Sequence, residues 1–208
     1  MFNYLKYSLR RKVSFIVSRL LGSFVYEKSL NLPGQKLDLG CGPAKLPGHI
    51  GIDKIPVERV DVICDVEKNY LPFRDESFDV VYSSNTLEHI ENIEEVLSEV
   101  WRILRKNGHF LIQVPYFGSP KAFQDPNHVR YFTLNTLDYF VEEQDVAPKW
   151  YYKRLFKKIV KKRYIFIRTP LNLIIGPIIN SSSSIQRWFE NSIFRVISPE
   201  AIEVDIVK

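Results

Sequence analysis

The sequence predicts an α/β fold in which short strands of a parallel sheet alternate with helices. Three observations support this: a series of short apolar runs, one strongly amphipathic helix between two of them, and a glycine pair directly after the first run. Such alternation is typical of βαβ units, whose strands pair in parallel. The length of 208 residues, with 45% hydrophobic and 25% charged residues, fits one domain of ordinary composition.

Short apolar runs predict the strands in chain order. The first five are residues 36–39, 49–53, 60–65, 78–83 and 110–114. A last strand is predicted near the end of the chain, because Ile202, Val204 and Ile206 alternate with Glu203 and Asp205. This alternation indicates a strand that is only half buried.

Two helices are predicted from apolar residues at helical spacing. In residues 91–105 these are Ile93, Val96, Leu97, Val100, Trp101 and Leu104. Acids at the start of this helix and basic residues at its end suit the helix dipole, and Asn107-Gly108 is typical of a helix stop. Thr133 is predicted to cap the second helix, whose apolar stripe is Leu134, Leu137, Phe140 and Val141.

Two parts of the chain are both basic and apolar. Residues 1–30 predict a basic amphipathic helix that precedes the main domain, residues 31–208. Residues 149–168 are basic and aromatic and contain no acid, and residues 171–179 form an apolar run that is too short to span a bilayer. We therefore expect a basic and apolar insertion at about residues 157–198.

The cysteine content predicts a reducing compartment. The only two cysteines, Cys41 and Cys64, form no disulfide framework and have no zinc-type spacing. The basic, apolar start of the chain makes a poor signal peptide, because Arg19 interrupts its apolar stretch and no clear cleavage site follows. We expect a cytoplasmic protein.

A glycine loop after the first strand is the predicted cofactor site. Residues 37–43 join that strand to a Gly-x-Gly turn, which allows a ligand to approach the main chain closely. The loop lies at the carboxyl end of a parallel strand, where ligands bind in open α/β sheets. Asp53 ends the next strand, where an acid can accept hydrogen bonds from ribose hydroxyls. Lys45 replaces the third glycine of the pyrophosphate-binding fingerprint, which disfavours NAD or FAD.

The sequence of this loop, Leu37-Asp-Leu-Gly-Cys-Gly-Pro43, closely resembles the first motif of class I S-adenosylmethionine (SAM)-dependent methyltransferases. Residues 65–73, 75–81, 87–90 and 99–108 continue the pattern of the methyltransferase type 11 family in the same order. The resemblance covers about residues 35–115. It implies SAM as the cofactor and a three-layer Rossmann-like fold, with a mostly parallel seven-stranded sheet whose last strand is antiparallel.

The resemblance also implies a set of cofactor-binding residues at the strand ends: Asp38, Gly40, Cys41, Gly42, Asp53, Asp65, Val66, Ser84 and Asn85. The glycine loop is expected to pass along the methionine and ribose, Asp53 to hold the ribose hydroxyls, and Asp65 to meet the adenine edge. Asp38 is expected to lie near the methionine amino group or to order the loop. For Asp38 and Asp65, a turn cap and a solvated loop acid remain alternatives.

Two histidines are candidate catalytic residues. Methyl transfer to a hydroxyl is an in-line displacement in which a positioned histidine or carboxylate removes the hydroxyl proton. His128 lies in residues 125–133, a segment that resembles type 11-like enzymes from bacterial surface-polysaccharide gene sets. His89 follows the fourth strand, and a structural role near the site is its alternative.

The segment around His128 contains two candidate acceptor-binding residues, Asp125 and Arg130, the latter suited to hold an anion. In the alternative, a hydrogen bond between these two residues, or one made by His128, only fastens the loop. Asp125, His128 and His89 would form a metal site as a further alternative, but no spacing demands one and none is predicted.

The sequence thus predicts an enzyme that transfers a methyl group from SAM to a hydroxyl of a sugar, glycan or lipid-linked intermediate. The alternatives are a methyltransferase for another small molecule or RNA, and a non-catalytic SAM-binding protein with a regulatory or structural role. RNA is less favoured, because residues 84–86 are Ser-Asn-Thr where many base-amino methyltransferases have Asn-Pro-Pro-Tyr.

The net charge and the basic, apolar segments of the chain indicate what kind of partner the protein binds. The net charge of +5 and a pI near 9.1 favour an anionic partner. Basic residues beside amphipathic segments indicate peripheral contact with an anionic membrane surface, here the inner membrane, with core packing or a dimer contact as the alternative.

Overall fold

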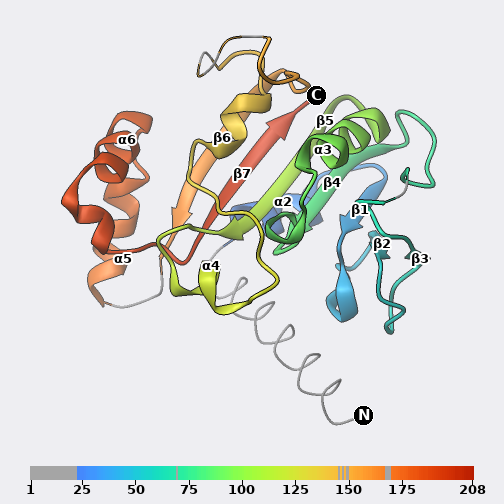
Figure 1. Ribbon diagram of the computed structural model, residues 1–208, viewed down its shortest axis with the longest axis horizontal. Coiled ribbons are helices and arrows are strands. Elements are labelled where there is room, and N and C mark those ends of the chain that lie inside the picture. Colours follow the sequence, from blue (N-terminus) through green and yellow to red (C-terminus); the bar gives the residue numbers. More distant parts are fainter. Residues whose placement is uncertain (1–22, 69, 145, 147, 149, 167–169) are drawn as a thin grey trace.

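A computed structural model describes residues 23–208, except residues 69, 145, 147, 149 and 167–169. Its centre is a seven-stranded sheet with the order β3-β2-β1-β4-β5-β7-β6 (Figure 1). The strands are β1 (Lys36–Leu39), β2 (Ile50–Asp53), β3 (Val62–Ile63), β4 (Phe78–Ser84), β5 (Leu104–Pro115), β6 (Lys158–Ile165) and β7 (Ala201–Val207). The first five run parallel, whereas β7 is antiparallel to both β5 and β6. The predicted, mostly parallel seven-stranded sheet is confirmed.

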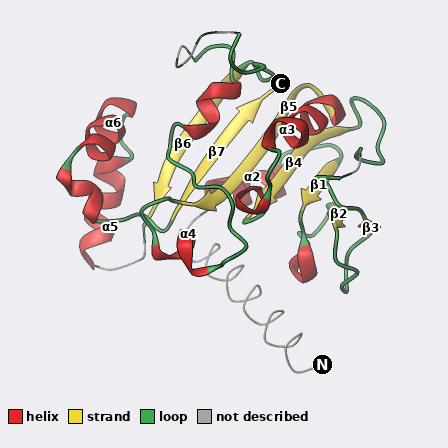
Figure 2. Ribbon diagram, in the orientation of Figure 1, coloured by secondary structure: helices red, strands yellow, loops and turns green. Residues whose placement is uncertain are grey.

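Helices lie on both faces of this sheet and beyond its β6 edge (Figure 2). They are α2 (Phe24–Asn31), α3 (Ile93–Ile103), α4 (Pro120–Gln124), α5 (Pro170–Ile179) and α6 (Ser183–Asn191). Successive residues of a strand point to opposite faces. Accordingly, Val80 and Tyr82 of β4 pack with Val25 of α2, whereas Val81 packs in the cluster that contains Leu97 of α3. This alternation produces the three layers.

The boundary between α3 and β5 differs from the prediction. The helix ends at Ile103, and the strand begins at Leu104, earlier than predicted. Asn107 has a φ of 62° within the strand instead of ending the helix. The cause is a contact with the other end of the chain, because the amide of Asn107 donates to the Lys208 carbonyl (3.2 Å) and that of Lys208 to the Gly108 carbonyl (3.1 Å).

β7 is buried throughout, so the prediction of a half-buried strand was wrong. Glu203 and Asp205 are 0% and 1% exposed. Packing of α2 against the strand explains this burial, since the Glu203 carboxylate accepts from the amide of Phe24 (3.1 Å) at the start of that helix. Lys28 of α2 forms an ion pair with Asp205. The pattern of the strand alone does not reveal a helix 170 or more positions away.

Two further elements are shorter or tighter than predicted. The strand expected over residues 60–65 pairs only at Val62–Ile63. The helix expected after Thr133 is a 3₁₀ helix, Thr136–Phe140, and Asn135, not Thr133, occupies its N-cap position. The Thr133 hydroxyl instead accepts from the Asn135 amide (3.3 Å), ahead of the helix. The predicted stripe of Leu134, Leu137, Phe140 and Val141 is nevertheless buried.

The predicted basic and apolar segments lie at two places. Most of the predicted N-terminal helix, residues 1–30, falls outside the described residues, and its last part forms α2. α5 and α6 lie between β6 and β7 in the chain, within the expected insertion, and form a helical pair beyond the β6 edge of the sheet (Figure 1). In the described part of the chain, no helix has the length and hydrophobicity needed to span a bilayer.

Arg102 of α3 explains why two of the resembling motifs occur together. Its guanidinium donates to the Glu99 carboxylate (2.8 Å) and to the carbonyls of Leu71 (3.0 Å) and Phe73 (2.9 Å). Glu99 in turn accepts from the Leu71 amide (2.9 Å). A planar guanidinium suits this divergent set of acceptors, so the segment before β4 is fastened to α3.

His49 makes the stability of the fold depend on pH. It is 5% exposed; its Nε2 accepts from the Ser29 hydroxyl (2.6 Å), while Nδ1 contacts the Pro47 carbonyl (3.0 Å). Burial is the main cause that lowers the pKa of His49 from 6.5. The hydrogen bond to the Pro47 carbonyl raises this pKa in part, and the charges of Lys36 and Lys45 lower it further. The unfolded chain therefore binds this proton more readily than the folded chain. Protonation destabilises the fold once the pH falls below the usual pKa of an exposed histidine.

We expect the free energy of unfolding to decrease on acidification from pH 7.5 to 5.5, by at most about 1.4 kcal/mol per pH unit from this group. Urea unfolding at both pH values would measure it. The His49→Gln variant should lose less stability over this interval than the wild-type chain. An equal loss in both proteins would contradict the assignment to His49.

Candidate active site

The predicted cofactor residues meet at one edge of the sheet. Leu39 of β1 pairs in register with Ile52 of β2 and Ser83 of β4, and all three strands run in the same direction. The glycine loop, Asp53 and the residues after β4 therefore emerge side by side. This is the edge at which open α/β sheets bind their ligands.

The glycine loop is held by main-chain bonds to β2. The amides of Gly40 and Cys41 both donate to the Ile52 carbonyl (2.9 and 3.1 Å), and the Gly42 amide donates to Asp53 Oδ2 (2.7 Å). Gly40 has a φ of 69°, and a Cβ there would lie 2.2 Å from Thr86 Oγ1. Glycine is thus required at this position by both conformation and the packing of the segment after β4.

Two acids fasten this loop in different ways. Asp38 is buried, and its Oδ2 accepts from the Leu46 amide (2.9 Å), which is the loop-ordering role considered for it. Asp53 is only partly buried and accepts from the amides of Gly42 (2.7 Å) and Ile55 (3.0 Å). A carboxylate offers about four acceptor sites, so Asp53 can still accept from two hydroxyls.

The other predicted cofactor residues lie on the neighbouring loops. Asp65 Oδ1 accepts from the Glu67 amide (3.2 Å), and Val66 packs partly buried against the core. Asn85 has a φ of 51°, and its Nδ2 donates to Ser84 Oγ (3.3 Å). The roles that the resemblance implies for these residues remain predictions.

The chemistry of this edge fits SAM better than a dinucleotide. SAM carries positive charge on its sulfonium and ammonium groups, which acids such as Asp53 and Asp65 favour. The only lysine or arginine between Gly40 and Gly48 is Lys45, and its ammonium pairs with Asp61 (2.7 Å) instead of being available to a phosphate.

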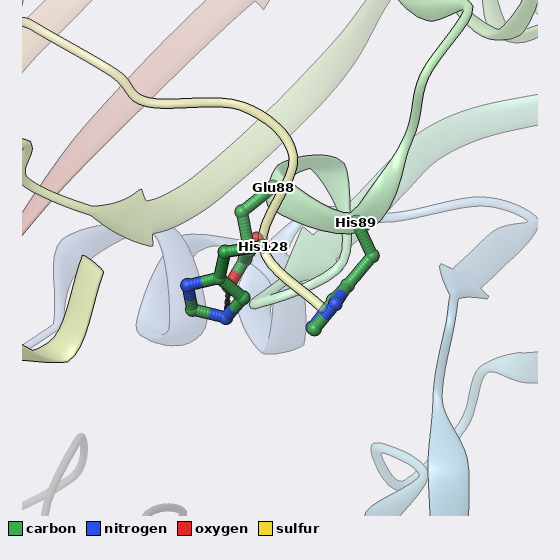
Figure 3. Close-up of side chains that lie close together, drawn as sticks. All are labelled: Glu88, His89 and His128. Carbon is green, nitrogen blue, oxygen red and sulfur yellow. Dashed lines mark ion pairs between the residues drawn. The ribbon is translucent and has the colours of Figure 1, made fainter. Parts of the chain in front are cut away.

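Both candidate catalytic histidines lie next to the buried carboxylate of Glu88 (Figure 3). The His89 and His128 ring centroids are 4.7 Å apart, and His128 Nε2 lies 4.0 Å from Glu88 Oε1. Nδ1 of His89 contacts the Asn127 carbonyl (3.2 Å), and Nδ1 of His128 contacts the Ala122 carbonyl (2.9 Å). Burial is the main cause that lowers the pKa of His89 from its usual value, so its neutral form is favoured.

Asp125 and Arg130 both make contacts that fasten the loop, Asp125 within it and Arg130 to the segment after β4. Asp125 Oδ1 accepts from the amide (2.9 Å) and the side chain (3.0 Å) of Asn127, and the backbone bond is the main cause that lowers the pKa of Asp125. Arg130 donates to the carbonyls of Ile90 (3.3 Å) and Glu91 (2.6 Å). The proposed acceptor-binding role of these two side chains remains a prediction.

Several features of the site were missed by sequence reasoning. Glu88 falls within residues 87–90 of the family pattern but was not predicted as a site residue, although it is 1% exposed beside two histidines. Phe123 and Tyr131 stack with centroids 4.6 Å apart and remain 60% and 46% exposed. The local sequence around Glu88 is mostly polar and gives no sign that this acid is buried, because His128, its neighbour in space, comes from a segment about 40 residues later.

A cavity of about 710 Å³ adjoins the end of β5 and was also missed. Tyr116, Gly118, Asn191 and Arg195 are among the residues that line it. Burial raises the pKa of Tyr116 to about 12, so its phenol keeps its proton. Tyr116 pairs with Phe132, which connects this cavity to the segment that carries His128.

Comparison with known proteins supports the interpretation of this edge. The sequence model of the methyltransferase domain family matches residues 37–112. Sterol 4-C-methyltransferase strm-1 of Caenorhabditis elegans is 28% identical over 145 residues, which are 55% of this chain and 43% of that protein. 24-methylenesterol C-methyltransferase 2 of Arabidopsis thaliana is 34% identical over 122 residues, 47% of this chain and 34% of that protein. The match thus spans less than half the length of either curated relative.

The fold has close counterparts among solved structures. A SAM-dependent methyltransferase from Archaeoglobus fulgidus superposes with a TM-score of 0.62 at 17% identity, over 95% of this chain and 94% of that one. At this identity the likeness concerns the fold. Residues 37–112 thus match the methyltransferase domain family, and the chain has the fold of class I SAM-dependent methyltransferases.

Proposed function

We propose that the protein transfers the methyl group of SAM to a hydroxyl of a sugar, a glycan or a lipid-linked intermediate. One observation carries this proposal: the segment after β4 joins the cofactor edge directly to Glu88, His89 and His128. A methyl donor bound along the glycine loop and an acceptor bound at the histidines would therefore be neighbours.

The side chains of this chain would position the reactants. SAM, when bound, supplies a methyl group on a sulfonium. Asp53 would hold the ribose, and Ser84 and Asn85 would line the path from the methionine to the acceptor. Because each histidine presents Nδ1 to a carbonyl, its Nε2 is left as an acceptor beside the hydroxyl. Alignment of the oxygen with the methyl group supplies much of the rate enhancement in such a displacement.

The surroundings of His128 support a ring-shaped or apolar acceptor. The stacked and exposed Phe123 and Tyr131 flank His128 in the chain and offer apolar faces to a sugar ring or an isoprenoid chain. The cavity beside Tyr116 adds polar groups from Asn191 and Arg195. A second candidate is a carbon acceptor on an apolar molecule, because both curated relatives described above are named sterol C-methyltransferases.

A transfer assay with methyl-labelled SAM tests the proposed function. We expect label to enter a glycan or lipid-linked fraction and remain on oxygen. Label on carbon in a sterol or isoprenoid fraction would support the second candidate, and label in RNA would reject both. Calorimetric binding of SAM without transfer to any fraction would favour a non-catalytic SAM-binding protein.

We further propose that α5, α6 and the turn after them contact an anionic membrane surface. The protein surface that would contact the membrane consists of exposed apolar side chains, namely Leu171, Leu173, Ile174, Ile178, Trp188, Ile193 and Phe194. Arg187 and Arg195 are exposed beside them and would attract anionic lipid. Such an arrangement suits a lipid-linked acceptor at the inner face of a membrane.

Liposome flotation tests this surface. We expect the protein to float with vesicles that contain anionic phospholipid at low salt, and much less with neutral vesicles. The double variant Ile174→Asp and Ile178→Asp should stay in solution, because two charges replace exposed apolar side chains without a cost in core packing. Absence of wild-type binding at low salt would reject membrane contact.

A further inference from the structure

The side chains of Glu88, His89 and His128 form a compact group of three potential metal ligands. Glu88 and His89 belong to the 3₁₀ turn Leu87–His89 after β4, and His128 lies about 40 residues later. The amides of Val129 and Arg130 both donate to the Glu88 carbonyl (2.9 and 3.1 Å). Main-chain bonds thus fix the two segments against each other, so the group is built into the fold.

The three side chains lie close together, and each has a potential ligand atom near those of the other two (Figure 3). A carbonyl oxygen only accepts, so the contacts with Asn127 (3.2 Å) and Ala122 (2.9 Å) assign the proton of each imidazole to Nδ1. Nε2 of His89 and of His128 then carries a lone pair. A backbone carbonyl on the other ring nitrogen is the usual arrangement of metal-binding histidines, because it fixes the ring and the tautomer.

We propose that Glu88, His89 and His128 bind one divalent transition-metal ion through a carboxylate oxygen and two Nε2 atoms. One ligand atom of each residue lies within 4.8 Å of the others. In a tetrahedral zinc site, ligand atoms are roughly 3.3 Å apart. Small side-chain rotations that move each ligand atom by about 1 Å would therefore complete the site. Two imidazoles and one carboxylate leave a coordination position open, as in catalytic zinc sites.

A plain ion pair between Glu88 and His128 accounts for the geometry less well. Their closest atoms are 4.0 Å apart, which is too long for a hydrogen bond. An ion pair between Glu88 and His128 also does not involve His89, although the ring centroids of the two histidines are only 4.7 Å apart. A cation between them would contact all three side chains at once.

The geometry also changes the ligand set that the sequence suggested. Asp125 was the carboxylate considered there with the two histidines, but its Oδ1 accepts from Asn127 at the turn of the loop. Glu88 takes its place in the group. An ion held here would lie near the end of β4, where its open position could hold an oxygen of the acceptor. In that case the ion, and not a histidine Nε2, would ease the loss of the hydroxyl proton by lowering the pKa of the bound oxygen.

Zinc titration of the full chain tests the site without reference to methyl transfer. The purified protein is treated with chelator, dialysed and titrated with Zn²⁺ in a calorimeter. We expect one ion per chain with a dissociation constant of about 1 μM or below. Glu88→Gln, His89→Gln and His128→Gln should each weaken binding by at least about tenfold. Addition of Co²⁺ should give the visible absorption of a tetrahedral site.

The matched control is His109→Gln, which alters a histidine on β5 outside the group and should leave Zn²⁺ affinity unchanged. His89 is only half buried, so His89→Gln keeps the test valid if the Glu88 variant does not fold. The proposal is overturned by absence of stoichiometric binding, by binding that all three glutamine variants retain, or by binding that is lost only on Cys64→Ser.

Discussion

Replacing Asp53 with alanine is expected to weaken SAM binding at least 100-fold. The Asp53 carboxylate accepts from the Gly42 amide at 2.7 Å and retains acceptor sites for two ribose hydroxyls. Hydrogen bonds to a charged group contribute about 1.5–3 kcal/mol each, and about 1.4 kcal/mol corresponds to a factor of ten in affinity. Calorimetric titration of each protein with SAM measures the change in the dissociation constant.

Two further variants separate contact with the ribose from ordering of the loop. Asp53→Asn keeps an oxygen for the Gly42 amide but loses the charge, so we expect an intermediate loss of about tenfold. Asp61→Asn alters the partner of Lys45 and should change the binding free energy by less than about 1 kcal/mol. Wild-type affinity in the alanine variant, or an equal loss in the Asp61 variant, would show that Asp53 does not hold the cofactor.

The cofactor edge could be predicted from the sequence because its determinants are local. The glycine loop follows β1 directly, and Asp53 ends the next strand, so the order of the chain already places them together in a parallel sheet. The steric reason for Gly40 could not be predicted. It depends on Thr86, which β4 brings within 2.2 Å of a Cβ at that position.

The acceptor side could be predicted only in part, because its residues come from segments that are far apart in the sequence. His89 and His128 could each be singled out from their motifs, but not their adjacency to each other and to Glu88. That adjacency arises from main-chain bonds between two distant loops. Likewise, a buried carboxylate such as Asp205 looks like a solvent-facing residue in an alternating strand until the helix that covers it is known.

Replacing Lys28 with methionine is expected to lower the free energy of unfolding by about 3 kcal/mol. Lys28 of α2 forms an ion pair with Asp205, whose side chain is 1% exposed. Removing one partner of a buried pair costs about 3–5 kcal/mol, because the remaining charge stays buried without compensation. The lower end applies here, since Lys28 is 28% exposed and His109 Nδ1 still contacts Asp205 at 2.7 Å. Urea unfolding at pH 7.5 measures the loss.

The double variant Lys28→Met with Asp205→Asn distinguishes two ways in which α2 could be attached to the sheet: by the ion pair or by apolar packing. If the cost arises from the uncompensated carboxylate, the double variant should be more stable than Lys28→Met alone, since the amide carries no charge into the interior. If α2 were held mainly by Val25 and Tyr26 against β4, both variants would unfold close to the wild-type midpoint. The cycle therefore determines whether charge or apolar packing attaches α2 to the strand that it buries.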